Sequence, residues 1–265
     1  MPIIKTLVKA TKLEKEKFTI PKSVQDAIPI QRIWPDGIFQ VGSRFSKTFF
    51  FTDINYQIAG KEDKTAMFLD YSELLNALDS GASAKITINN RKINKAEFEK
   101  SLLLPMKEDG LNHFRKEYNE MLLSKVTGTN NSVVQDRYIT ITVAKRNIDE
   151  ARTYFSRVGT DLITHLSQLS SIGRELDAGT RLQVFRDFFK GNEPAAFAFD
   201  LKEQMKKGHN FKDWLCPDSM EFQKDHFRLN DRWGRVLYLQ GYASYIKDSM
   251  IAELCDMDRS LMLSI

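Results

Sequence analysis

The side chains that most often carry catalysis or bind metals are few and scattered in this chain. Its histidines are His113, His165, His209 and His226. An imidazole acts as a general base or a zinc ligand only beside suitable partner residues. His165 falls on the apolar stripe of a predicted helix, which favours a packed, hydrogen-bonded residue, and His226 stands between Asp225 and Phe227. The histidines therefore predict no catalytic or metal site.

Two further polar groups have a spacing that allows chemistry. Asp256 and Asp258 are two residues apart, and paired carboxylates can serve as a general acid and base. A turn between a helix and a strand explains this pair better. Lys206, Lys207 and His209 form a short basic segment, which at this charge density is typical of a solvated corner.

Motifs with a known chemical mechanism are absent from the sequence. It contains no glycine-rich phosphate-binding loop, no dinucleotide fingerprint, no nucleophile elbow and no His-Glu-x-x-His zinc motif. Cys216 and Cys255 are far apart, which indicates free thiols of a cytoplasmic chain rather than a zinc site. We therefore expect this chain to be no enzyme and to bind no cofactor or metal by itself.

Positive charge is concentrated at the N-terminus. The net charge is +4, and residues 1–22, named the basic arm here, carry six lysines against two glutamates. The remaining chain is neutral. An anionic membrane surface and a nucleic-acid backbone both suit such an arm, and a solvated tail is the alternative. The candidate contacts with an anionic surface are Lys5, Lys9, Lys12, Lys15, Lys17 and Lys22.

The elements that must position any site follow from the hydrophobic periodicity. Alternation predicts strands over residues 38–43, 46–54, 84–90, 137–144, 227–239 and 259–265. Steps of three and four predict helices over residues 63–78, 111–125, 147–176, 180–190 and 246–257. Residues 191–218 look irregular. In the longest helix, Asn147 with Glu150 is a start of capping-box type, and its apolar stripe is expected to pack on a sheet, with a partner helix as the alternative.

Two segments of the chain resemble each other. Residues 39–51 align with residues 227–239 at a constant offset of 188, and a helix and a strand follow each copy. We therefore expect an α+β fold of two strand-strand-helix-strand units, residues 37–90 and 219–265, in antiparallel or mixed sheets covered on one face by helices. A helix-rich insertion, residues 91–218, separates the units. Duplication and convergent hairpin patterning both explain the likeness.

Three quoted stretches carry a resemblance to a known family. They are I-P-I-Q-R-I-W-P-D-G-I-F with F-F-F-T-D-I-N-Y-Q-I-A, then V-V-Q-D-R-Y-I-T-I-T-V, and finally D-S-M-E-F-Q-K-D-H-F-R-L-N-D-R-W-G-R-V-L-Y-L. In this order and spacing the chain, from about residue 21 onward, resembles the N-terminal domain of VirB-type conjugal transfer ATPases, the fourth VirB component of type IV secretion systems. The likeness is closest to the branch on conjugative elements of Gram-positive bacteria. Residues 219–231 are its most specific part, and the turn at residues 53–56 comes second.

The resemblance implies a division of labour. In that family the nucleotide site, with ATP and magnesium, lies in a C-terminal motor domain that follows the matched region. The resemblance therefore implies a non-catalytic assembly domain over residues 35–265, preceded by the arm and a proline-containing lead-in over residues 1–34. Ile265 is then expected to be a cut within a longer protein. The implied partners are the inner-membrane subunit of the transfer channel, neighbouring ATPase copies and the cytoplasmic face of the cell membrane.

Two alternative functions are compared with this expectation. The first is a stand-alone nucleic-acid-binding α+β protein, which would use the basic arm and strand aromatics such as Phe50 and Tyr238 to stack bases. The neutral folded body and the missing RNA-recognition signature speak against it. The second is a small-molecule enzyme, for which only the Asp256 and Asp258 pair and His226 could be named.

Overall fold

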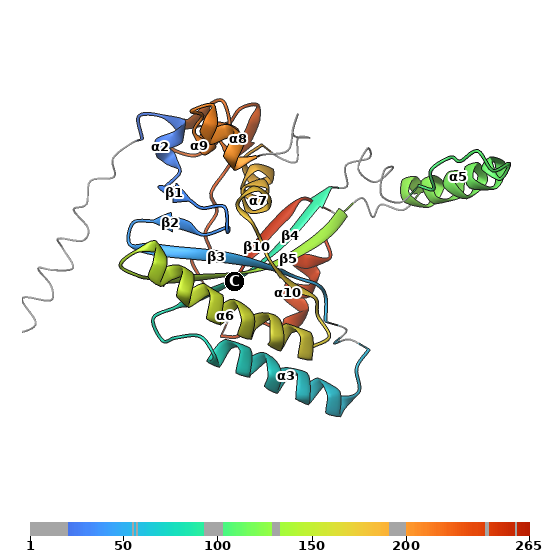
Figure 1. Ribbon diagram of the computed structural model, residues 1–265, viewed down its shortest axis with the longest axis horizontal. Helices are drawn as coiled ribbons and strands as arrows, with labels where there is room; N and C mark the ends of the chain where they lie inside the picture. Colours follow the sequence, from blue (N-terminus) through green and yellow to red (C-terminus); the bar gives the residue numbers. More distant parts are fainter. Residues whose placement is uncertain are drawn as a thin grey trace, which may run out of the picture.

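The computed structural model has an α+β fold, as the sequence predicts (Figure 1). It describes residues 21–54, 56, 58–92, 103–128, 133–190, 200–241, 244–257 and 259–265. Within these residues there are eight helices and ten strands, and every strand pair is antiparallel.

Most strands lie in one large sheet. In spatial order they are β1 (Arg32–Ile33), β2 (Phe39–Val41), β3 (Arg44–Phe51), β5 (Val133–Ala144), β4 (Ser83–Lys92) and β10 (Leu261–Ser264). The short strand β6 (Gly173–Glu175) pairs with the last residues of β3. The central strand β5 alternates, so that Ile139 and Ile141 point into the core that includes Phe45 and Phe49 of β3, while Tyr138 points to the opposite face.

Helix α6 (Ile148–Gln168) covers the centre of this sheet. Asn147 accepts a hydrogen bond from the backbone N–H of Glu150 at 2.9 Å, which is the predicted helix start. The predicted packing on the sheet is confirmed, since the apolar stripe joins the core formed by β3 and β5. The buried stripe residues are Ala151, Phe155, Val158, Leu162 and Leu166.

The prediction that this helix runs to Leu176 is wrong. The helix ends at Gln168, and Ser170 takes a left-handed conformation with φ 59°. Gly173 then begins β6, where an added Cβ would lie 2.8 Å from Leu166 Cδ1. The apolar spacing continues past the helix end because Leu176 is buried as well, but against the sheet. Pairing with β3 therefore overrides the helical pattern.

Helix α3 (Lys61–Asn76) lies beside α6 on the same face of the sheet and buries Leu74 in the same core. It connects β3 with β4. The first predicted unit, a hairpin followed by a helix and a strand, is therefore present as expected.

A second core lies on the opposite face of the sheet, towards β1 and β2, so the prediction that helices cover one face is wrong. It joins helices α2 (Val24–Ala27), α7 (Ala178–Lys190) and α9 (Phe211–Leu215) around Phe39. The lead-in before residue 35 belongs to this folded body, because Ile28 and Ile30 are buried there.

The prediction that residues 191–218 are irregular is wrong for its described part. Helices α8 (Leu201–Lys206) and α9 both form there, while residues 191–199 lie outside the described residues. A capping box of Asn210 and Asp213 starts α9. Helices this short bury too few apolar residues to show a period in the sequence.

The second predicted unit has its elements but not one common sheet. Strands β7 (Met220–Phe222), β8 (Phe227–Leu229) and β9 (Arg232–Gly234) form a separate three-stranded sheet. Helix α10 (Asp248–Cys255) follows, and β10 then joins the large sheet beside β4.

The two similar hairpins fold alike only at their turns. At the offset of 188, the register of β2 with β3 repeats in β8 with β9, and Gly42 (φ 59°) matches Asn230 (φ 51°). Beyond the turn they differ. Strand β3 continues to Phe51 because β5 pairs along its whole length, whereas β9 ends at Gly234.

Helix α5 (Asn112–Gly128) stands apart from the large sheet (Figure 1). The segment before it folds back along the helix. The Asn119 side chain accepts from the backbone N–H of Leu104 at 2.9 Å and donates to its carbonyl oxygen at 3.0 Å. Arg115 holds Asp109 with two hydrogen bonds, which keeps the pKa of that carboxyl low, at about 2.

Candidate functional site

The residues predicted for acid–base or metal chemistry do not come together. His165 contacts Gln168 at 3.1 Å, and His226 contacts Asp225 at 2.8 Å, each within its own segment. Among the described residues, no three His, Cys, Asp or Glu side chains could hold one metal ion. Asp256 caps the end of α10, and Asp258 lies outside the described residues.

The two cysteines are separate thiols. Cys216 is buried and Cys255 is half-buried, and burial raises the pKa of both. Thiols of this kind are protonated at neutral pH and poor nucleophiles.

The predicted anionic-surface contacts are only partly visible. Lys5, Lys9, Lys12, Lys15 and Lys17 lie outside the described residues. Lys22 is described and exposed immediately before α2.

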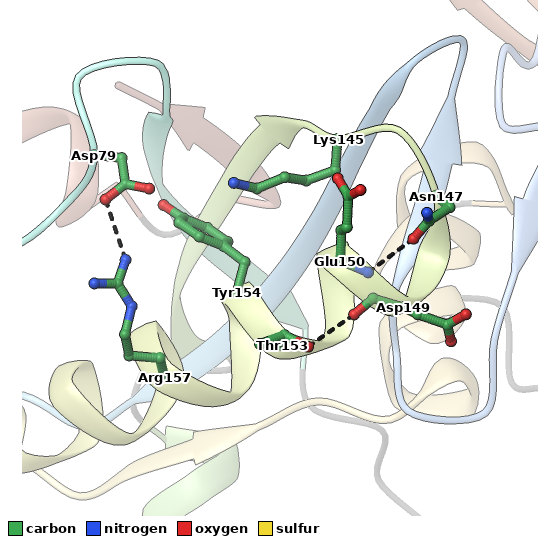
Figure 2. A pocket seen from close by; sticks show the side chains of 8 residues that line it. All are labelled: Asp79, Lys145, Asn147, Asp149, Glu150, Thr153, Tyr154 and Arg157. Atoms are coloured by element: carbon green, nitrogen blue, oxygen red, sulfur yellow. Dashed lines mark hydrogen bonds and ion pairs between the residues drawn. The ribbon is translucent and has the colours of Figure 1, made fainter.

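A polar groove lies beside the N-terminal half of α6 (Figure 2). It has a volume of about 580 Å³ and is centred on Tyr154. The Lys145 ammonium lies 4.6 Å from the ring centroid, and Arg157 lies 5.9 Å from it on its way to Asp79, which it contacts at 3.2 Å. The lining residues are Asp79, Lys145, Asn147, Asp149, Glu150, Thr153, Tyr154 and Arg157.

The chemistry of this groove is not that of an acid–base pair. Tyr154 is 5% exposed, and its hydroxyl has no hydrogen-bond partner among the described residues. Burial raises its pKa, so it remains a neutral phenol at physiological pH. Arg157 acts in the opposite direction, but burial is the largest cause and the net shift of the Tyr154 pKa is upward. The groove therefore presents side chains of both charges around a neutral phenol.

A smaller pocket of about 250 Å³ lies between α7 and α9. Arg186 stacks over the Trp214 ring at 5.1 Å and donates to the Trp214 carbonyl oxygen at 3.2 Å. The other residues that line this pocket are Lys190, Gln204, His209, Asn210 and Asp213. Lys207, in the predicted basic segment, contacts Glu203 at 2.6 Å and is exposed, as expected for a solvated corner.

The strand aromatics proposed for base stacking are not presented on an open sheet. Phe50 is half-buried with the Arg174 guanidinium 4.8 Å from its ring, and its neighbour Tyr138 is buried. Tyr238 is exposed, but the prediction that it lies on a strand is wrong, because β9 ends at Gly234.

The structure instead exposes an unusual amount of apolar surface near its C-terminal end. We name Val236, Leu237, Tyr238 and Leu239 the apolar segment, and each is more than two-thirds exposed. The sequence pattern predicted a strand here. An extension of β9 beyond Gly234 would have to pair with residues 223–226. These residues form the turn between β7 and β8, so they provide no partner strand.

Apolar side chains are also exposed on helix α10 and just after it. Met250 and Leu254 on the helix and Met257 beyond its end are exposed, while Ile251 and Cys255 are half-buried. Four consecutive exposed apolar residues, as in the apolar segment, exceed the single exposed apolar side chains that are ordinary on a protein surface, and this is typical of a binding surface.

Helix α5 carries a second such surface. Leu111, Phe114, Tyr118 and Met121 follow steps of three and four along one side of the helix, and all are exposed. The periodicity of the sequence identifies this stripe. It does not reveal that the stripe stays exposed, with no element among the described residues covering it.

None of the helices in the described part of the chain is both long and apolar enough to cross a bilayer. No protein-family model matches the chain, and no curated protein matches it either.

Proposed function

We propose that this chain is a non-catalytic docking domain of a conjugative-transfer ATPase of the VirB type. The observation that carries the docking role is the exposed apolar segment, in which Leu237 is 84% and Tyr238 is 83% exposed. The assignment to the transfer ATPases rests on the sequence resemblance described above. Under this proposal the chain is no enzyme and takes no cofactor, and ATP and magnesium act only in a motor domain.

The proposed partners follow from the two kinds of surface. The apolar segment and α5 suit the small inner-membrane subunit of the transfer channel and neighbouring copies of the ATPase, because burial of apolar area drives such contacts. The basic arm suits the anionic inner face of the cell membrane, so the proposed location is cytoplasmic and peripheral to that membrane. Nucleic acid is not a proposed partner of the neutral folded body.

The test uses the inner-membrane channel subunit of the same transfer system in detergent micelles. Binding is measured by co-purification and titration with the wild-type chain and with Leu237→Asp combined with Tyr238→Asp. Burying two such side chains is worth about 3 kcal/mol or more, so the variant should bind about 100-fold more weakly.

The matched control is Ile58→Asp, which changes another highly exposed apolar residue and should bind like the wild type. Equal binding of both variants would remove the docking role from the apolar segment. ATP hydrolysis by the purified chain above the blank would refute the non-catalytic assignment.

A further inference from the structure

The pocket between α7 and α9 holds a buried guanidinium that the protein itself leaves largely unpaired (Figure 1). Arg186 is 8% exposed, and its one hydrogen bond to a described residue runs from Nη1 to the Trp214 carbonyl oxygen. Its Nε–H has no partner, and no carboxylate among the described residues lies within ion-pair distance of it. A guanidinium taken out of water is stabilised when an anion pairs with it, and here the anion is lacking.

Lys190 adds a second cation one helical turn further along α7. Its side chain is only 15% exposed, whereas a lysine is ordinarily solvated. Its ion-pair partner Asp218 is largely exposed, and the two charged atoms are 3.7 Å apart, which makes this a weak, screened contact. Arg186 and Lys190 therefore bring two positive charges to the same pocket.

The other polar side chains of the pocket mainly offer unused donors. The side-chain oxygen of Asn210 accepts from the Lys212 backbone N–H at 3.0 Å, and its amide N–H groups have no partner among the described residues. The same holds for the side-chain amide of Gln204, in α8. The Asp213 carboxylate is engaged already, since it accepts from the Asn210 backbone N–H at 3.3 Å and from the Gln25 amide at 3.2 Å. A ligand of this pocket must therefore supply acceptors and negative charge.

We propose that this pocket binds a phosphate group. Its donors come from α7, α8 and the start of α9, and the oxygens of a phosphate diverge towards several sides, whereas the two oxygens of a carboxylate lie in one plane. A guanidinium matches a phosphate with two parallel hydrogen bonds, and an ammonium binds it as a point charge. A phosphate monoester carries about two negative charges at neutral pH, which Arg186 and Lys190 balance.

The size of the pocket favours a small soluble phosphate as the source of this group. The volume is about 250 Å³, which is below the range of about 300–1,000 Å³ that is usual for sites of larger ligands. A lipid headgroup is the other source of the same chemistry. The proposal does not rest on the docking role of the apolar segment.

The test is isothermal titration calorimetry of the whole chain with sodium phosphate, at an ionic strength kept constant with chloride. We expect saturable binding at about millimolar phosphate, since an ion of so few atoms reaches only modest affinity. Lys190→Gln should weaken binding about 10-fold or more, because a hydrogen bond between charged groups is lost. Arg186→Met should weaken it at least as much, and Arg186→Lys, which keeps the charge without the planar fork, should restore it only in part.

Lys207→Gln is the matched control. It makes the same change as Lys190→Gln in an exposed lysine that pairs with Glu203 and does not line the pocket. This variant should bind phosphate like the wild type. Circular dichroism compares the folds of all variants, and Lys190→Gln, at the end of α7, still tests the site if the Arg186 variants do not fold.

Absence of saturable binding up to about tens of millimolar phosphate would overturn the proposal. Equal affinities of the wild type, Lys190→Gln and Lys207→Gln would overturn it as well, because the binding would then lie outside the pocket.

The source of the phosphate is determined with phosphatidylcholine vesicles that contain phosphatidic acid. Weaker co-sedimentation of Lys190→Gln than of Lys207→Gln would identify a lipid headgroup as the ligand. Equal co-sedimentation, together with the expected loss of free phosphate binding, would identify a soluble phosphate. The basic arm is the same in both variants, so it does not affect this comparison.

Discussion

Replacing Arg181 by methionine removes a cation that α7 buries beneath the β2–β3 hairpin. Arg181 is 4% exposed, and no carboxylate among the described residues pairs with it. Its guanidinium donates to the carbonyl oxygens of Gly37 (2.9 Å) and Ser46 (2.6 Å) and to the Ser46 hydroxyl (2.7 Å), and it stacks 4.1 Å from the Phe39 ring centroid. Burial lowers its pKa to about 9, so it stays charged at neutral pH.

Two effects oppose each other in this substitution. Methionine fills much of the same volume but leaves two backbone carbonyls without a donor, at about 1–3 kcal/mol each. Loss of the stacking on Phe39 adds about 1 kcal/mol. Against this, the variant no longer buries a charge, and it also removes an Nε–H that has no partner. Because the lost contacts outnumber the relieved ones, we expect a net loss of about 3 kcal/mol.

The assay is urea unfolding followed by circular dichroism, supported by a thermal melt. For a chain of this size, about 3 kcal/mol corresponds to a fall in Tm of roughly 6–12 °C. Arg157→Met is the matched control. That arginine is exposed and pairs with Asp79 at the surface, so its loss should cost under about 1 kcal/mol. Equal stabilities of the two variants would refute the view that the buried guanidinium locks the hairpin to α7.

Three further outcomes are expected. Gly37→Ala should destabilise the fold by several kcal/mol in urea unfolding, since φ is +78° and the new Cβ would lie 1.9 Å from the Leu176 carbonyl oxygen. Gly42→Ala is the control: its φ is +59° but its new Cβ would meet no atom, so it should cost only about 1 kcal/mol. Because Arg115 lowers the pKa of Asp109 to about 2 from its ordinary 3.8, this contact stabilises the α5 segment above pH 4 and is lost as the pH falls towards 2. The protection of the α5 amides against hydrogen exchange, taken relative to the intrinsic exchange rate at each pH, should fall there, and Arg115→Met should abolish that pH dependence. Deleting the basic arm should abolish co-sedimentation with anionic vesicles, and binding that survives the deletion, or is equal on neutral vesicles, would remove the membrane role of the arm.

The start of α6 is determined by the local sequence. Asn147 and Glu150 set the first turn through contacts only three residues apart, and the structure places the helix start there. The end of the same helix is not determined by neighbouring residues in the sequence. The apolar steps continue to Leu176, but hydrogen bonds from β3 draw residues 173–175 into the sheet.

The candidate surfaces divide in the same way. Periodicity identifies the stripe on α5 and the strand-like pattern of Val236–Leu239, yet neither pattern reveals whether another element covers it. That depends on partners distant in the chain. The buried Arg181 gives no sequence signal, because an arginine on a helix is ordinarily solvated.

The two similar hairpins mark the boundary between what the sequence determines and what only the tertiary structure decides. The sequence alone determines their turns, since Gly42 and Asn230 both accept a left-handed backbone, and the register is the same in both. It also determines the α+β class through the alternation of two periods. Tertiary structure decides the lengths of the strands and their sheets. A strand extends only where a neighbour supplies hydrogen bonds, and β5 supplies them to β3, whereas no described strand does so beyond the end of β9.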